Sequence, residues 1–214
     1  MHKGVYIGKE AKQLKDRVLI LGESHHSSNE NEDYTTKDVI ENYRCQESHN
    51  YVFFDKIVQS FGINEDNKDN RFILFWEKVY FGNYVDEYCG VKDSQAKNNI
   101  IKNRVQYNDE LFKFINDNNI TKVFVFSRLV YNNLPSLSEE NKSIENLTCL
   151  NKEPLMINGK KDYISHCKYL PNTEHNSTNV KLKHEVIVYG MRHPSARGGY
   201  NAGNYSEYLK KEIF

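Results

Sequence analysis

The 214-residue chain has little proline and glycine, few cysteines and no long apolar segment. With 4 Pro and 11 Gly, it is not a low-complexity or linker-rich chain. No apolar run reaches the roughly 18 residues of a membrane-spanning helix, so we expect no membrane partner. Residues 1–18 lack the apolar core and the cleavage site of a secretory signal, and a cytoplasmic location is therefore expected.

The four cysteines also lack the spacing of a metal site. Cys45, Cys89, Cys149 and Cys167 are far apart, with no C-x-x-C pair. Zinc ribbons and iron–sulfur clusters usually need ligands in close pairs. We therefore predict reduced thiols and neither a metal nor another cofactor.

The chain also lacks an excess of charge of either sign. Lys and Arg together number 29, as do Asp and Glu, so the net charge is zero and a general nucleic-acid coat is disfavoured. Residues 151–214, however, carry four more cationic than acidic side chains. A DNA enzyme needs only a local positive face, which this part of the chain can supply.

What the chain does have is aromatic residues and three short apolar runs. Its 15 Tyr and 11 Phe can fill a core although only 38% of residues are hydrophobic, and we predict one domain over residues 1–214. Residues 17–22, 122–127 and 184–190 read as buried parallel strands. Helical spacing predicts helices within 48–62, 71–85 and 108–119, the first stopped by Gly62 and the last capped by Asn108. This order predicts an α/β fold with three layers, α/β/α.

Residues 136–182 are polar and interrupt this pattern. Two short possible strands, "EPLMING" and "DYISHCKY", flank Asn158-Gly159, a dipeptide typical of hairpin turns. We interpret this segment as an inserted hairpin and loop that borders a site.

Polar residues follow each predicted strand. Ligands of open parallel sheets bind at the carboxyl ends of the strands, so these residues are expected to face one crevice. They are Gly22, Glu23, Ser24, His25 and His26 after the first strand, Ser127 and Arg128 after the second, and Arg192, His193, Pro194, Ser195, Arg197 and Gly198 after the third.

Each of these signals has a purely structural alternative. His25 and His26 can be surface-loop residues, and Glu23 can lie at a helix N-terminus. Asn83 can cap a helix C-terminus, and Gly198 can belong to a flexible turn.

Four segments in this order resemble the uracil-DNA glycosylase superfamily: "VLILGESHHSS", "FWEKVYFGNYV", "KVFVFSRLVYNNLP" and "VIVYGMRHPSARGG". The resemblance runs from about residue 17 to 213, except for the 136–182 segment. It implies a mainly parallel four-stranded sheet and a monomer that acts on double- or single-stranded DNA. The implied reaction flips a pyrimidine out of the helix and hydrolyses its N-glycosidic bond.

The resemblance also implies roles for individual residues. His193 matches the histidine that donates to the base O2 as negative charge develops there. Glu23, the acid of the first loop, takes the part of the carboxylate that stabilises the sugar cation and orients or deprotonates water. Asn83 matches the residue that reads the base edge, with Phe81 or Tyr84 stacking on the base. Substrate contacts are further assigned to Gly22, Ser24, His25, His26 and Ser195, and DNA contacts to Ser127, Arg128, Met191, Arg192, Pro194, Arg197, Gly198 and Tyr200, with Lys181 and Lys183 on the same rim.

The first loop departs from the best-known uracil enzymes, which have Gly-Gln-Asp-Pro-Tyr-His. Alignment on Gly22 puts Ser24 at their acid, His25 at their Pro and His26 at the Tyr that excludes a 5-methyl group. The cysteine cluster of the iron–sulfur branches is absent as well. We therefore expect an outlying branch whose base is uracil, a 5-substituted pyrimidine or another damaged base, and we predict that it accepts a 5-substituted pyrimidine. Its role is in repair or in defence against phage DNA carrying modified cytosine.

Two other functions stay open at this point. The chain can be a non-catalytic DNA-binding member of the same fold, since Ser24 stands at the usual acid position. It can also be a metal-dependent hydrolase with Glu23, His25, His26 and His193 as ligands.

Overall fold

The computed structural model describes residues 4–25, 35–44, 52–63, 68–89, 93–136, 155–157, 160–162, 164–195 and 200–213. Its main sheet has six strands in the order β1-β3-β2-β4-β8-β7, and β5 and β6 form a separate pair. The strands are β1 Tyr6–Ile7, β2 Val18–His25, β3 Val79–Tyr88, β4 Lys122–Val125, β5 Leu155–Ile157, β6 Lys160–Asp162, β7 Ser165–Tyr169 and β8 Val186–Gly190. The helices are α1 Thr36–Arg44, α2 Val52–Ser60, α3 Lys68–Lys78, α4 Asp93–Lys102, α5 Arg104–Asn118, α6 Arg128–Asn133 and α7 Ala202–Ile213.

The three strands predicted from apolar runs are parallel neighbours, which confirms that prediction. β2 pairs with β4, and β4 pairs with β8, both in parallel. β3 lies parallel to β2 on its other side. The sheet is nevertheless mixed and six-stranded, not four-stranded, because β1 and β7 add antiparallel edges. β1 has two residues, too few for a periodic pattern. β7 lies within the predicted strand "DYISHCKY", which we expected in an inserted hairpin rather than at the edge of the main sheet.

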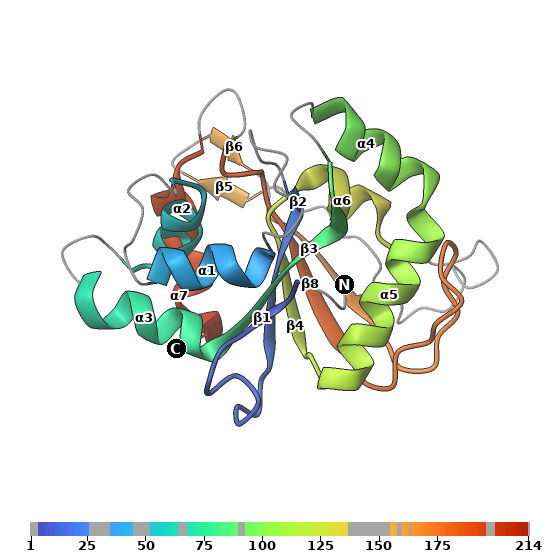
Figure 1. The fold of residues 1–214 in the computed structure, drawn as a ribbon, viewed down its shortest axis with the longest axis horizontal. Coiled ribbons are helices and arrows are strands. Elements are labelled where there is room, and N and C mark those ends of the chain that lie inside the picture. The colour runs from blue at the N-terminus through green and yellow to red at the C-terminus, as the bar shows by residue number, and fades with distance from the viewer. Residues whose placement is uncertain are drawn as a thin grey trace.

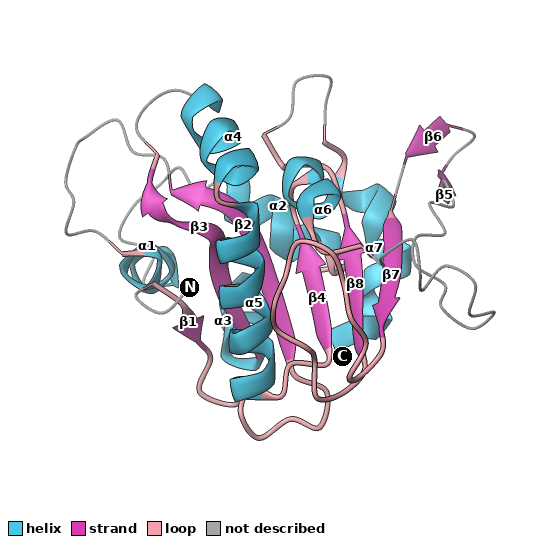
Figure 2. Cartoon of the chain, turned by 90° about the vertical axis from the view of Figure 1, so that its right-hand side faces the viewer, coloured by secondary structure: helices cyan, strands magenta, loops and turns pink. Residues whose placement is uncertain are grey.

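Helices cover both faces of this sheet, as the α/β prediction requires. Figures 1 and 2 show α1, α2, α3 and α7 on one side and α4, α5 and α6 on the other. Two apolar clusters fill the layers: one contains Ile57, Trp76 and Tyr205, and the other contains Leu111 and Val130. Burial of these large side chains provides the main driving force for folding.

The helix predicted over 71–85 is wrong in its second half. α3 ends at Lys78, and Val79 begins β3, the strand that pairs with both β1 and β2. Both faces of β3 are buried, with Phe81 in one apolar cluster and Tyr84 in the other. A strand covered on both faces shows no alternation, so spacing alone does not separate it from a buried helix.

Asn108 is likewise not a helix cap. α5 begins at Arg104, and the buried Asn108 lies within it. Its Nδ2 donates to the carbonyls of Asn133 and Ser177, and its Oδ1 accepts from the Tyr84 hydroxyl at 2.7 Å. This satisfied polar centre joins β3, α5, the end of α6 and the loop that contains Ser177. Gly62 does follow the end of α2, with a positive φ of 80°.

Part of the segment interpreted as an insert belongs to the main sheet. β5, within "EPLMING", does pair antiparallel with a following strand, but its partner is β6 and not the predicted strand "DYISHCKY"; residues 158–159 lie outside the described part of the chain. β7 pairs with β8, and Cys167, Tyr169 and Leu182 are core residues. None of the described helices is long and apolar enough to cross a membrane.

His175, within residues 136–182, is buried, and we expect it to make the stability of the fold depend on pH. Its ring lies between Tyr169 and Phe112, at centroid distances of 5.0 Å and 6.1 Å, and neither ring nitrogen has a hydrogen-bond partner among the described residues. Burial lowers the pKa of His175 below its ordinary 6.5. The unfolded chain therefore binds this proton first, so the free energy of unfolding is expected to fall as the pH drops below about 6.5, by at most about 1.4 kcal/mol per pH unit.

Denaturant unfolding between pH 8 and pH 5 measures this dependence. His175→Phe should flatten the decline, whereas His166→Phe, at an exposed position on β7, should leave it unchanged. An equal decline in wild type and His175→Phe would contradict the assignment.

Candidate functional site

The carboxyl ends of β2, β4 and β8 meet at one edge of the sheet, and a carboxylate–hydroxyl pair lies there. Glu23 lies near the carboxyl end of β2 and is half-buried. Its Oε2 accepts a hydrogen bond of 2.6 Å from the Ser127 hydroxyl. Ser127 follows β4, the strand paired with β2. This distance is at the short end of the range for hydrogen bonds donated by a hydroxyl to an oxygen.

The Ser127 hydroxyl makes two hydrogen bonds, one as donor and one as acceptor. Its Oγ also accepts from the Val130 N–H at 3.2 Å and so caps α6. The single hydroxyl proton is left for Glu23. With 1% exposure, Ser127 offers no surface to DNA, so the predicted DNA contact is replaced by a contact that orients Glu23.

Gly22 and Asn83 lie opposite one another next to this pair, on β2 and β3. A Cβ at Gly22 would overlap the Asn83 Oδ1, so the absence of a side chain lets the carboxamide lie over the β2 backbone. Asn83 is buried, and its Nδ2 donates to the Thr36 hydroxyl at 3.0 Å. Thr36 opens α1, and this contact was not foreseen from the sequence. The pairing of β2 with β3 shifts register after Ser24, which changes the strand geometry at the site.

His193 lies in the turn after β8, and its protonation is set locally. The Ser195 N–H donates to its Nδ1 at 3.2 Å. Because an amide N–H can only donate, Nδ1 must accept, and in the neutral ring the proton is on Nε2. His193 is thus prepared as a hydrogen-bond donor through Nε2.

Glu23 and His193 come from strands that have β4 between them. Neighbouring strands lie about 4.8 Å apart, so the two ends are separated by about 10 Å.

The aromatic contact is not the one predicted. Phe81 and Tyr84 are 1% and 0% exposed, because both faces of β3 are covered, and neither ring offers a face to a base. The half-buried Phe53 of α2 instead lies 5.1 Å from the His193 ring, between centroids. Sequence analysis assigned Phe53 to a helix without a role, since nothing local shows that α2 meets the turn after β8.

Met191 and Tyr200, to which the resemblance assigns DNA contacts, are also in the core. Met191 is fully buried, and the buried Tyr200 hydroxyl lies 2.7 Å from the Ser60 Oγ. Since Ser60 donates to the Lys56 carbonyl, Tyr200 is the donor to Ser60. Both anchor the chain on either side of the His193 turn.

The remaining predicted residues divide into three groups. Ser24, Arg128 and Arg192 are half-buried at the carboxyl edge, and Ser195 is exposed there, while Pro194 is buried with its carbonyl bonded to Lys56. The backbone of His25 ends β2 opposite Tyr88. His26, Arg197 and Gly198 lie outside the described residues.

Lys181 and Lys183 do not share the rim with Arg192. They precede β8 and Arg192 follows it, so the 5-residue strand separates them by about 17 Å. Lys181 pairs with Glu174 at 2.8 Å. The prediction that they join one DNA-facing surface is wrong, because proximity in sequence across a strand means opposite edges of the sheet.

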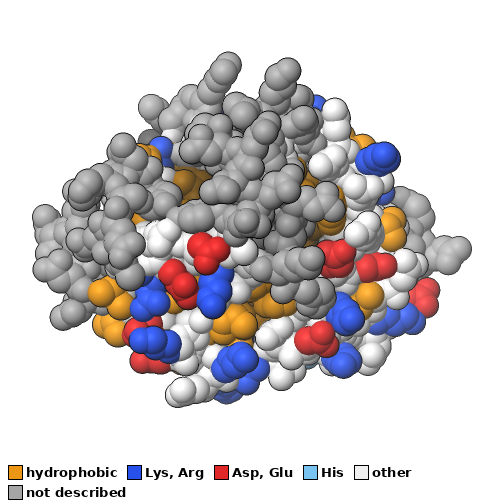
Figure 3. Space-filling model, in the orientation of Figure 1, with side chains coloured by type: hydrophobic (Ala, Val, Ile, Leu, Met, Phe, Trp, Pro, Cys, Tyr) orange, Lys and Arg blue, Asp and Glu red, His pale blue; other side chains and the backbone are white. Residues whose placement is uncertain are grey.

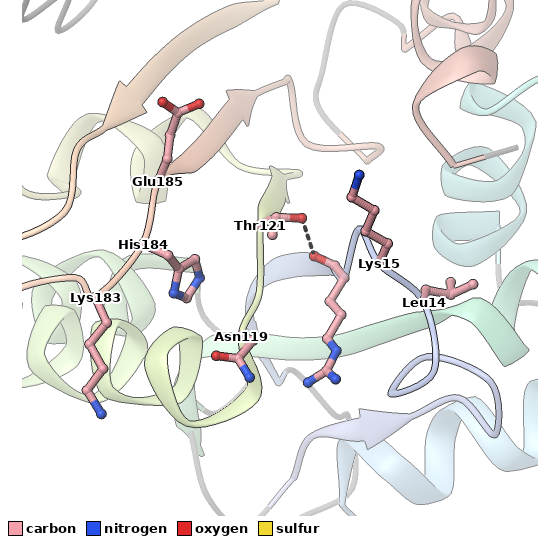
Figure 4. A pocket seen from close by; sticks show the side chains of 8 residues that line it. Leu14, Lys15, Asn119, Thr121, Lys183, His184 and Glu185 are labelled. Atoms are coloured by element: carbon pink, nitrogen blue, oxygen red, sulfur yellow. Dashed lines mark hydrogen bonds between the residues drawn. The ribbon is translucent and has the colours of Figure 1, made fainter.

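A separate pocket of about 490 Å³ opens at that opposite edge, lined by Lys15, Arg17, Lys183 and His184 among others. Figure 4 shows Lys15 and Lys183 extending away from each other. Arg17 donates to the Asn118 carbonyl, and His184 Nε2 lies 2.7 Å from the Ile120 carbonyl. The cationic groups do not converge, so the pocket is not a candidate site.

Metal ligands do not gather among the described residues: no group of three His, Cys, Asp or Glu side chains is placed to hold an ion there. The described cysteines, Cys89 and Cys167, are buried thiols. On the face shown in Figure 3, described side chains of both charge signs are interspersed.

Comparison with known proteins identifies no relative. No protein-family model matches the chain, and a search of curated proteins finds no match.

Proposed function

We propose that the chain is a DNA glycosylase of the uracil-DNA glycosylase type that excises a flipped pyrimidine. The observation that carries the proposal is that the same edge of the sheet holds an oriented carboxylate and an oriented imidazole. Glu23 is oriented by the Ser127 hydroxyl, and His193 carries its proton on Nε2. They follow or end β8 and β2, the two strands on either side of β4, so both lie at the carboxyl end of the parallel strands.

The chemistry divides between these two groups. As the bond from the sugar C1′ to the base nitrogen breaks, its electron pair leaves with the base. The His193 Nε2–H donates to the base O2, where negative charge develops. Glu23 stabilises the positive charge on the sugar and accepts a proton from the water that attacks C1′. The products are a free base and an abasic sugar.

Asn83 supports recognition of the base edge. Its carboxamide lies beside Gly22 and is oriented by the hydroxyl of Thr36. Phe53 takes the place of Phe81 and Tyr84 as the aromatic ring at the site. The substrate is duplex or single-stranded DNA, and the protein acts as a monomer in the cytoplasm without a cofactor.

Base release from defined duplexes tests the proposal. DNA carrying uracil, hypoxanthine or bulky 5-modified cytosine is incubated with the protein and assayed for alkali-labile sites. We expect release of a 5-substituted pyrimidine, because His26 replaces the Tyr that closes the C5 side of the pocket. A polar pocket wall left unpaired by plain uracil penalises that base.

The outcomes separate the alternatives. Rapid release of uracil alone would contradict the substrate choice and keep the glycosylase function. Binding to abasic or modified DNA without base release from any duplex would favour a non-catalytic protein. Activity abolished by a chelator would favour the metal-dependent hydrolase.

Arg192 is predicted to contact a DNA phosphate, since it follows β8 at the same edge as Glu23. Arg192→Gln should weaken DNA binding and lower the slope of log Kd against log salt by about one. Lys183→Gln removes the same charge from the opposite end of β8 and serves as the control. Binding titrations over a range of salt measure both, and an equal change in the two variants would contradict the assigned DNA face.

A further inference from the structure

α2 contacts the segment after β8 at three points along one helix face. The residues involved are three and four positions apart, and such positions share a face. The contacts are Phe53 to the His193 ring at 5.1 Å, Lys56 Nζ to the Pro194 carbonyl at 2.8 Å, and Ser60 to the Tyr200 hydroxyl at 2.7 Å. The position of the segment that carries His193 therefore depends on contacts with α2.

The Lys56 contact holds the turn at its centre. The Met191 N–H is bonded to the Val125 carbonyl, which fixes where the turn begins. The Ser195 N–H is spent on His193 Nδ1, and Pro194 has no N–H to donate. The Lys56 ammonium is thus the side chain from outside the turn that fixes its backbone between these two points, within the described residues.

α2 is itself rigidly placed, so it can act as a support. The Tyr43 hydroxyl of α1 donates to Asp55 at 2.8 Å. Phe54 is buried against Trp76 and Phe81, with ring centroids 5.8 Å and 5.4 Å away. Lys56 directly follows these two anchored residues and is half-buried, with no ion pair to a described carboxylate.

We infer that Lys56 is a positioning residue for His193, an inference that rests on the proposed function. By holding the Pro194 carbonyl, it keeps the Ser195 N–H against Nδ1 and so keeps the His193 proton on Nε2. Lys56 acts through the turn, because its ammonium is bonded to the Pro194 carbonyl.

Lys56→Met tests the inference, because it keeps most of the side-chain length and removes the donor. We expect kcat for base release to fall by about 10- to 100-fold, with KM little changed, since a small displacement of a catalytic group costs this much. Lys56→Arg restores a cationic donor and should recover most of the rate. Lys97→Met, at an exposed position of α4, removes a charge without a comparable contact and should behave as wild type.

Nitrogen-15 NMR of the imidazole provides a readout that does not need a substrate. Wild type and Lys56→Arg should show His193 with its proton on Nε2, and Lys56→Met should show a mixture of both tautomers. An unchanged tautomer in Lys56→Met would overturn the inference. So would a changed KM and salt slope at constant kcat, which would make Lys56 a phosphate contact.

The two proposals fail in different ways. If wild type releases no base from any duplex, the proposed function fails, and the NMR comparison alone decides whether Lys56 positions the ring. If wild type is active and Lys56→Met matches it in kcat and tautomer, the function stands and the positioning role is refuted.

Discussion

Replacing His193 with alanine is expected to lower the rate of base release by about 100- to 1000-fold, the usual effect of losing one donor to a developing anion. The ring lies in a turn beyond β8 and is half-buried, so its loss removes little core. Single-turnover kinetics on the preferred duplex measure the effect on chemistry, and thermal unfolding confirms that the fold persists.

Two further variants sharpen this experiment. His193→Gln retains an amide donor and should recover part of the rate. His166→Ala removes an exposed histidine from β7 and should leave the rate unchanged. A fully active His193→Ala protein would show that the departing base is stabilised by another group and that the site is wrongly assigned.

Replacing Glu23 with glutamine is expected to lower the rate by about 100- to 10,000-fold, the range for loss of a general base. Glutamine has nearly the same shape as glutamate. Its carbonyl oxygen can still accept the hydrogen bond that the Ser127 hydroxyl donates to Glu23 Oε2 at 2.6 Å. Stability should therefore change little while the basic oxygen is lost.

A matched control uses an acid that takes no part in the site. Glu41→Gln changes a side chain of α1 whose partner is Lys37, in an exposed pair at 3.7 Å. It should keep full activity. Glu23→Gln with an undiminished rate would mean that another residue activates the water.

The central strands and their polar ends were predictable because their signals are local. Residues 17–22, 122–127 and 184–190 are continuous apolar runs, and such a run is enough to predict a buried parallel strand. The carboxyl ends of parallel neighbours share an edge by geometry, so Glu23, Ser127 and His193 could be grouped before the structure was seen. The resemblance to a glycosylase added roles that these residues alone do not carry.

Errors arose where burial on two faces or contacts distant in sequence decide the outcome. β3 was read as helix because its residues are buried on both sides and show no alternation. The resemblance assigns Phe81 and Tyr84 to the site as neighbours of Asn83, but both rings are packed into the two apolar clusters. Lys183 was grouped with Arg192 because the direction of β8 between them was not considered.

The sequence by itself determined the α/β class, three neighbouring parallel strands and the edge of the sheet where polar side chains gather. Only the tertiary structure decided which of those side chains hold one another. The Ser127 bond to Glu23 joins residues on different strands, and α2 brings Phe53 and Lys56 to the His193 turn across more than a hundred residues. Such contacts depend on how helices pack against the completed sheet, and no local pattern encodes them, because packing is decided by the shapes of surfaces that exist only once the chain has folded.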